Sequence, residues 1–188
     1  MKCLSYIAVL AGFALSIMTP SVSVANYHGK DPTKETVLIG IQTAAAGAPD
    51  EMIIKFELEP AKPMLMPPGM HGSTTMVMAP RADEKYHFEV KPEDPKSKTR
   101  ISYANVRVTE VNTNSEKKVE LDLHPMWGSS GLHYSANGPL PGDGIYTATV
   151  VVSPPTFARD ATKEKDRWMR PLKAEFRFRF EKGLIIEN

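Results

Sequence analysis

The chain has 188 residues and a formal net charge of +1. With 41% hydrophobic and 24% charged residues, its composition is that of a globular protein that buries a core. Because 23 basic residues are matched by 22 acidic ones, no large positive field is available for phosphates, which argues against nucleic-acid binding. The single cysteine excludes a disulfide framework and a thiolate zinc site, and the 16 prolines argue against a helical bundle.

Residues 1–25 have the pattern of a cleaved signal peptide. Lys2 supplies the positive start, an apolar run extends from Leu4 to Met18, and the small residues before position 26 suit signal peptidase. The run is shorter than the about 20 residues that span a bilayer. We therefore expect export to the periplasm, no membrane insertion after cleavage, and one domain over residues 26–188.

The only cysteine, Cys3, lies in this leader, so the exported chain would contain no thiolate. A blue-copper site and cysteine-nucleophile catalysis are excluded on that ground. Any metal must be held by His, Met, Asp or Glu. The sequence has no motif for serine hydrolysis, zinc proteolysis or phosphate binding, and we expect a binding protein, not an enzyme.

Short segments rich in branched and aromatic residues follow a polar start, separated by Pro, Gly and Asn clusters. In the last of them, Phe176 and Phe178 share one face while Arg177 and Arg179 share the other, which is typical of a half-buried strand. Such segments with turn signals between them predict an all-β fold, an antiparallel sandwich or barrel. Residues 161–167 are the one candidate for a helical turn or two. Strands are predicted over residues 36–42, 52–58, 74–78, 86–90, 100–111, 118–123, 145–152 and 173–180.

His87 and Glu89 form the first candidate metal site. Residues two apart in a strand project from the same face, roughly 7 Å apart at about 3.3 Å rise per residue. The imidazole and the carboxylate would therefore stand side by side, while Tyr86, Phe88 and Val90 face the core. The alternative is that the pair is the solvated face of a half-buried strand, which is the default in antiparallel sheets.

Residues 124–134 hold two imidazoles and a thioether on a predicted loop whose glycines permit a sharp reversal. Imidazole suits copper or zinc, and a thioether adds a preference for copper, particularly Cu(I). His124, Met126 and His133 are therefore the second candidate site. The alternative is that Met126 and Trp127 pack beneath the loop and His133 lies in solvent.

Residues 64–78 contain five methionines. Clustered methionines can collect soft copper ions, and methionine is equally a flexible filler of irregular cores. In the pairs Met64/Met66 and Met76/Met78, the sulfurs share one face of an extended backbone. Both interpretations of this segment stay open.

Together these segments resemble the bacterial periplasmic iron-transport proteins that bind copper, a family of small dimeric proteins encoded beside an iron permease and grouped with a treponemal lipoprotein antigen. That family carries a strand with H-x-E, a P-M-x-x-x-D-G-x-H-Y-G-x-N loop, a P-G-x-G-x-Y-x-x-T strand, and a Trp-x-x-Pro before an alternating aromatic strand. The step from Met126 to His133 is preserved here, and Met52–Pro60 looks like the opening strand. The four motifs are matched in order by residues 87–89, 125–137, 141–149 and 168–171.

The resemblance implies an all-β, immunoglobulin-like (cupredoxin-like) antiparallel sandwich and a homodimer with a copper site near the dimer interface. Carried onto matching positions, it implies His87, Met126 and His133 as copper ligands. It also implies Glu89 as a variable ligand or as a ligand of a second metal, for which iron or manganese is expected.

Some positions depart from the family pattern. Asp160 stands where the family has a histidine, so the fourth imidazole is missing and Asp160 offers an oxygen ligand instead. His124 stands where the family tends to have a methionine and is a candidate to compensate. The segment Met64–Met78 is longer than the family pattern.

The sequence therefore predicts a non-catalytic periplasmic copper-binding protein that assists high-affinity iron uptake with an inner-membrane iron permease. Two alternatives stay open. One is a copper-delivery protein that uses the methionines as its surface. The other is a metal-free sandwich that serves protein–protein contacts.

Overall fold

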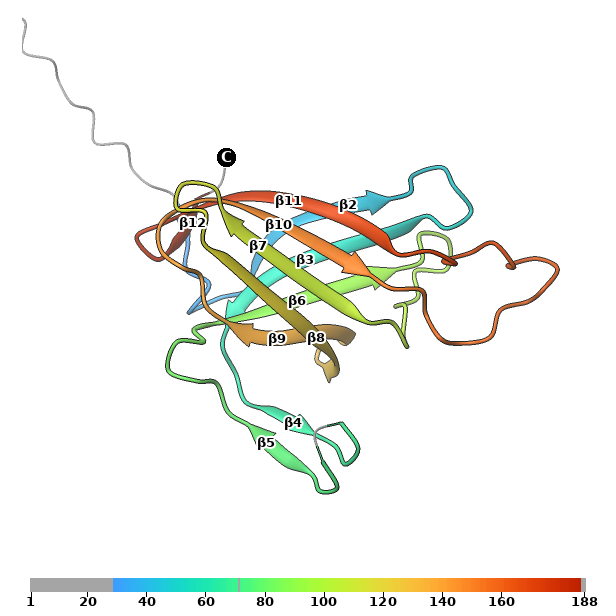
Figure 1. Cartoon of the computed structure of the whole chain (residues 1–188), viewed down its shortest axis with the longest axis horizontal. Coiled ribbons are helices and arrows are strands. Elements are labelled where there is room, and N and C mark those ends of the chain that lie inside the picture. Colours follow the sequence, from blue (N-terminus) through green and yellow to red (C-terminus); the bar gives the residue numbers. More distant parts are fainter. Residues whose placement is uncertain (1–28, 71, 187–188) are drawn as a thin grey trace, which may run out of the picture.

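The computed structural model describes residues 29–70 and 72–186, so the predicted leader lies outside the described residues. All the regular elements in the described part are strands (Figure 1). No helix there is long and apolar enough to cross a bilayer. The strands are β1 (Gly29–Lys30), β2 (Val37–Ala44), β3 (Met52–Pro60), β4 (Met64–Met66), β5 (Met76–Met78), β6 (Tyr86–Glu93), β7 (Val106–Asn112), β8 (Lys118–Gly128), β9 (Gly131–Gly138), β10 (Gly144–Val152), β11 (Leu172–Glu181) and β12 (Leu184–Ile186).

Ten strands form one antiparallel ladder in the order β1-β12-β11-β10-β7-β8-β9-β6-β3-β2, and β4 and β5 form a separate hairpin. The ladder folds back so that β2 lies against β11, which gives a nearly closed sandwich (Figure 1). β8 connects the two halves of the sandwich, because Lys118–Leu123 pair with β7 whereas His124–Gly128 pair with β9. The predicted all-β antiparallel sandwich is confirmed.

The alternation of β11 places its phenylalanines in the core. Phe176 packs against Phe56 of β3 with ring centroids 5.5 Å apart, and Phe178 stacks on Tyr146 of β10 at 5.2 Å. Phe88 of β6 is fully buried beside Phe56. These aromatic contacts join the two halves of the sandwich and fix the inner face of β3 and β6, so their outer faces are fixed as well.

The predicted strand over residues 100–111 begins only at Val106, so its first part was wrong. Tyr103 has a left-handed backbone with φ 57° and a side chain that is 71% exposed. A residue in that conformation cannot continue a strand. Residues 161–167 form hydrogen-bonded turns and no regular helix, and the one bond of helical spacing runs from the Glu164 N–H to the Asp160 carbonyl oxygen.

The predicted loop over residues 124–134 was wrong as well, because the segment is a β-hairpin. β8 runs on to Gly128 and β9 begins at Gly131, with a two-residue turn between them. Gly131 has φ 83°, a conformation that glycine adopts without steric cost. The hairpin holds the predicted ligands on rigid strands.

Candidate metal centre

The outer face of β3, β6, β9 and β8 carries rows of polar side chains. Residues directly opposite one another in an antiparallel pair project from the same face, with Cβ atoms about 5 Å apart. The row positions follow from the register of three strand pairs. The rows are Glu59–His87–Asn137, Glu57–Glu89–Ser135–His124, and His133–Met126.

His87, Glu89 and His133 form a buried cluster on this face. Each offers one ligand atom, and these atoms lie within 4.8 Å of one another. His87 is 0% exposed, Glu89 is 4% exposed and His133 is 1% exposed. The alternative that His87 and Glu89 form a solvated strand face is therefore wrong, since β6 is buried on both faces. The structure brings His133 of β9 to His87 and Glu89 of β6, from which it is far away in the sequence.

His87 is held in one tautomer by Asn137. The Asn137 amide group donates to the carbonyl oxygen of Lys62 at 2.8 Å, so its Oδ1 is turned to His87 Nδ1, at 2.9 Å. An amide oxygen can only accept, so the proton of His87 resides on Nδ1 and the lone pair on Nε2. That Nε2 atom is buried without a hydrogen-bond partner.

His133 is held in the same tautomer by a backbone carbonyl. Its Nδ1 donates to the oxygen of Gly131 at 2.9 Å, which leaves the lone pair on Nε2. This Nε2 atom is also buried without a hydrogen-bond partner, and it lies 3.5 Å from Glu89 Oε2. Locking of one ring nitrogen by a hydrogen bond so that the other is free is the usual arrangement of metal-binding histidines.

Burial keeps both imidazoles neutral to lower pH than a free histidine. It lowers the pKa of His87 to about 4, despite the hydrogen bond to Asn137. It also lowers the pKa of His133, against the attraction of the Glu89 carboxylate. Neutral imidazole is the form that binds a metal ion, so both rings are ready as ligands.

Glu89 is ionised although it is buried. Burial by itself would raise its pKa, but hydrogen bonds from Glu59 and Lys91 outweigh that effect and lower the pKa to about 2. The Lys91 ammonium lies 2.5 Å from Glu89 Oε1, and the Ser130 hydroxyl donates to the same oxygen at 3.1 Å. The other oxygen, Oε2, faces His133. The Oε2 atom of Glu89 is therefore available as a ligand atom beside the imidazoles.

Glu59 belongs to the cluster and was not predicted. Its Oε1 lies 3.9 Å from His87 Nε2, and it pairs with Lys62. Burial, together with the hydrogen bond to Glu89, raises the pKa of Glu59, whereas the same contact lowers the pKa of Glu89. The one sequence signal was the period-two spacing of Glu57 and Glu59 in the strand that pairs with β6.

A small pocket of about 100 Å³ connects this cluster to the surface. Charged side chains of both signs and the β8–β9 turn line it, so an ion can approach Glu89 and His133 through it. The lining residues are Thr36, Glu59, Lys62, Glu89, Lys91, Gly128, Ser129, Ser130 and His133.

Met126 lies directly opposite His133 across the β8–β9 ladder, on the same face. Its sulfur accepts a hydrogen bond from the Ser135 hydroxyl at 3.2 Å, and Ser135 in turn is opposite Glu89 in the ladder. The alternative in which Met126 packs beneath a loop and His133 lies in solvent is wrong, because His133 is buried. The thioether borders the cluster, as the prediction of a shared site requires.

The other two predicted ligands lie outside the cluster of His87, Glu89 and His133. His124 is on the same face of β8 but is opposite Ser135, next to a neighbouring pocket. Asp160 is exposed in the connection between β10 and β11, where its carboxylate accepts hydrogen bonds from Thr162 and Lys163. Within one chain, the structure does not bring Asp160 to the cluster, and its role as a ligand stays a prediction.

The donors present here suit copper. Two neutral imidazoles, a carboxylate oxygen and an adjacent thioether make a mixed set that can serve Cu(II) through nitrogen and oxygen and Cu(I) through nitrogen and sulfur. The two orphaned Nε2 atoms are the structural observation behind this fit, because buried polar atoms are rarely left without a partner.

Comparison with known proteins shows to which family the chain is related. Residues 50–182 match the family described as Fe2+ transport protein. UPF0423 proteins of Brucella abortus and Brucella suis are each 29% identical over 117 residues, which covers 54% of this chain. The chain spans 64% of the length of these curated relatives.

Two solved structures share the fold. FetP of uropathogenic Escherichia coli, recombinantly expressed in the periplasm, is 23% identical, with a TM-score of 0.62 over 78% of this chain and 97% of FetP. The copper-reconstituted P19 protein of Campylobacter jejuni is 20% identical, with a TM-score of 0.59 over 82% of this chain and 99% of that protein. Since the family match spans most of the sandwich and includes every residue of the cluster, the chain belongs to the Fe2+ transport protein family.

Proposed function

We propose that this protein is a non-catalytic periplasmic copper-binding protein that assists high-affinity iron uptake. The iron-transport part of the proposal is supported by family membership. The copper part is supported by the donor set and by the copper-reconstituted structure of P19, which shares the fold. The periplasmic location is supported by the leader pattern of residues 1–25 and by the periplasmic expression of FetP.

One observation carries the metal proposal. The Nε2 lone pair of His133 and the ionised Glu89 Oε2 face each other at 3.5 Å, and neither atom carries a proton. Two electron-pair donors that are buried this close repel each other unless a cation lies between them. His87 supplies a second lone pair at the same cluster.

In this proposal copper binds to His87, Met126 and His133, with Glu89 as the variable ligand. His124 and Asp160 are further candidates, and iron or manganese at a second site stays a prediction. Bound copper would supply a redox-active centre beside the pocket through which an iron ion approaches. The residues of the chain orient the donors, hold Glu89 ionised and exclude water.

The partners are proposals as well. A homodimer is supported by large apolar side chains that are exposed on the described surface, Leu38 and Ile41 on β2 and Trp127 next to the metal centre. An inner-membrane iron permease is the expected recipient of iron.

Metal analysis of the full chain, exported from cells grown with added copper, tests the site. The wild-type protein loaded with one equivalent of Cu(II) should retain it in the cluster, and both His133→Ala and Glu89→Gln should lower the retained Cu(II) at least tenfold. Glu120→Gln is the matched control, because Glu120 is paired with Lys118 on the exposed face of β8. Equal copper in wild type and His133→Ala would refute the proposal.

Growth of a deletion strain tests the role. Iron-limited growth should fail in the strain and recover with the wild-type gene but not with the His133→Ala gene. Copper sensitivity with normal growth at low iron would instead favour a copper-delivery protein, the second candidate, which is supported by the methionines around β4 and β5. A chain that retains no metal under any condition would favour the metal-free interaction module.

A further inference from the structure

The β4–β5 hairpin gathers methionines on one face. Met64 is opposite Met78 and Met66 is opposite Met76, so all four side chains project from the same side of the hairpin. The residues between them, Leu65 and Val77, project from the other side and are 70% and 63% exposed. Figure 1 shows this hairpin projecting from the sandwich beside the β8–β9 turn.

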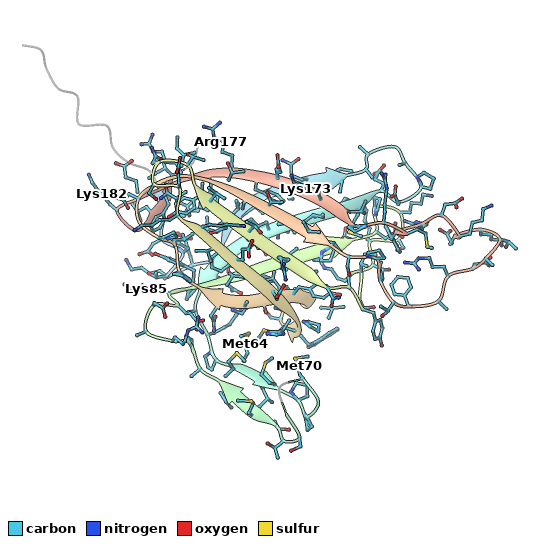
Figure 2. All side chains as sticks on the ribbon, in the orientation of Figure 1. Met64, Met70, Lys85, Lys173, Arg177 and Lys182 are labelled. Carbon is cyan, nitrogen blue, oxygen red and sulfur yellow. The ribbon has the colours of Figure 1, made fainter. Side chains whose placement is uncertain are left out.

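The β4 part of this methionine face is turned toward β8, whereas Met76 of β5 is 42% exposed. Met64 and Met66 are each only 3% exposed although the hairpin lies outside the main sheet. Met70, from the connection between β4 and β5, lies near them on the side of the main sheet (Figure 2). Six of the ten methionines of the sequence therefore belong to the hairpin, its connection and the facing part of β8.

A pocket of about 330 Å³ remains between the hairpin and β8. Four thioethers and one imidazole line it, together with an indole and prolines. Among the described residues, no carboxylate and no ammonium group lines it, so its donor atoms are thioether sulfurs and an imidazole nitrogen. The lining residues are Met64, Leu65, Met66, Pro67, Met70, His124, Pro125, Met126 and Trp127.

Packing alone accounts poorly for this arrangement. A methionine filler closes irregular gaps by virtue of its flexible chain, whereas here the thioethers surround an open space. Leucine or isoleucine would bury the same surface on a strand with better-defined rotamers. Thioethers with an imidazole are the donors that select Cu(I) among the biological metal ions.

The pocket and the His/Glu cluster meet at Met126. Its side chain lines the pocket and lies opposite His133, and its sulfur contacts Ser135, which is opposite both His124 and Glu89. A soft ion in the pocket would thus be one residue away from the buried donors.

We propose that the pocket between the β4–β5 hairpin and β8 is a second metal site, which binds a soft monovalent cation of the Cu(I) class through Met64, Met66 and Met70, with His124, while Met126 lies between the two sites. This site is separate from the His87–Glu89–His133 cluster. It extends the proposed function by giving the copper of the cluster a neighbouring site from which it is loaded.

Titration of the full exported chain with Ag(I), a redox-inert soft monovalent ion, tests the site. Native mass spectrometry should count two Ag(I) ions per wild-type chain. The double variant Met64→Leu/Met66→Leu should retain one ion, and Met70→Leu should weaken the second ion at least fivefold. Trp127, which is 79% exposed and lines the pocket, should report filling of the pocket by fluorescence quenching.

Matched variants separate metal loss from misfolding. Met→Leu exchanges usually cost less than about 1.5 kcal/mol of stability, and Met70 lies on a half-buried turn where the cost is smaller. Met169→Leu is the control, because Met169 is 61% exposed in the β10–β11 connection. It should bind two ions with unchanged affinity. Two ions at wild-type affinity in both Met64→Leu/Met66→Leu and Met70→Leu would overturn the inference.

The same experiment distinguishes this inference from the proposed function. His133→Ala should lose the ion of the cluster and keep the ion of the pocket. A wild-type chain that binds a single ion, lost in His133→Ala, would overturn the second site and leave the proposed function standing. A single ion that is lost only in the methionine variants would support the pocket site and overturn the metal site of the proposed function.

Discussion

Asn137 Oδ1 accepts the Nδ1–H of His87 at 2.9 Å, while the Asn137 amide nitrogen donates to the backbone of Lys62. The amide therefore cannot turn over without losing both contacts, and the imidazole it holds cannot change tautomer. The lone pair on His87 Nε2 is a consequence of this contact between β6 and β9.

Removal of the amide should weaken metal binding without changing any ligand. We expect Asn137→Ala to lower copper affinity about 10- to 100-fold, the range typical of residues that orient a metal-binding histidine. Asn137→Asp restores an acceptor for Nδ1–H and should recover part of the loss. Competition with a copper chelator measures both. Equal affinity of the alanine variant and the wild type, with Asn105→Ala as an exposed control, would show that Asn137 does not position His87.

Gly128 leaves room for the His133 ring. A Cβ atom at this position would lie 2.9 Å from His133 Cε1, closer than side-chain carbons approach in folded proteins. The ring is held by its bond to Gly131, so it must shift as a unit and move Nε2 away from Glu89. We expect Gly128→Ala to lower copper affinity at least tenfold.

The melting temperature should change little, because the site lies at the end of a hairpin. Ser129→Ala, in the same turn and exposed, is the control and should bind copper as the wild type does. A Gly128→Ala protein with wild-type affinity would mean that the ring position is not critical.

The ion pair of Asp94 and Arg167 fastens the β10–β11 connection to the sandwich. Arg167 Nη2 lies 2.6 Å from Asp94 Oδ1, and the guanidinium also covers the Trp168 ring at 4.2 Å. Both side chains are mostly buried, so this pair keeps more of its energy than a surface pair. Arg167→Ala should lower the free energy of unfolding by about 2 kcal/mol, measured by urea denaturation.

A surface pair with similar geometry gives the comparison. Arg107 Nε lies 2.7 Å from Asp122, but the two side chains are 56% and 72% exposed. Arg107→Ala should therefore change stability by no more than about 0.5 kcal/mol. Similar losses in the two variants would contradict the explanation by burial.

Glu110 makes stability depend on pH. It is 1% exposed on the core face of β7, and neither carboxyl oxygen has a hydrogen-bond partner. Burial raises the pKa of Glu110 well above the usual value, so the folded state keeps this proton to higher pH than the unfolded state does. The folded protein therefore binds more protons, and stability falls as pH rises above about 4.5 toward the folded-state pKa.

The slope should reach about 1.4 kcal/mol for each pH unit in that window. Glu110→Gln removes the ionisation and should flatten this part of the profile, so the variant gains stability over the wild type as pH rises. Urea denaturation at a series of pH values measures the difference. Glu120→Gln, on the surface, should leave the wild-type slope. An unchanged slope in Glu110→Gln would exclude Glu110 as its source.

The sequence was sufficient for the fold class and for part of the cluster. Alternation of apolar and polar residues over 173–180 arises because one face of the strand is buried, and the strand predicted from it is confirmed. The H-x-E strand and the step from Met126 to His133 were each visible locally. These residues come together because β8, β9 and β6 are neighbouring strands. That strand order was implied by the family resemblance and not by any local sequence pattern.

The misses have a common physical cause. Glu59 and Asn137 become part of the site through cross-strand partners, His87 in both cases, and strand order is a long-range property. The hairpin over residues 124–134 was taken for a loop because its prolines, glycines and serines resemble a loop composition. Its strands are held by tertiary packing, which outweighs local preference.

β8 pairs with β7 through its first half and with β9 through its second half. The register of one half is therefore tied to the register of the other. Side chains alternate along it, and a shift of one position at Lys118–Leu123 would carry Met126 to the opposite side of the sheet. An insertion of one residue in the first half, far from any donor atom, would therefore misplace the thioether unless a bulge absorbed it. Length variation among natural relatives should accordingly avoid β8 and fall in the β4–β5 and β10–β11 connections.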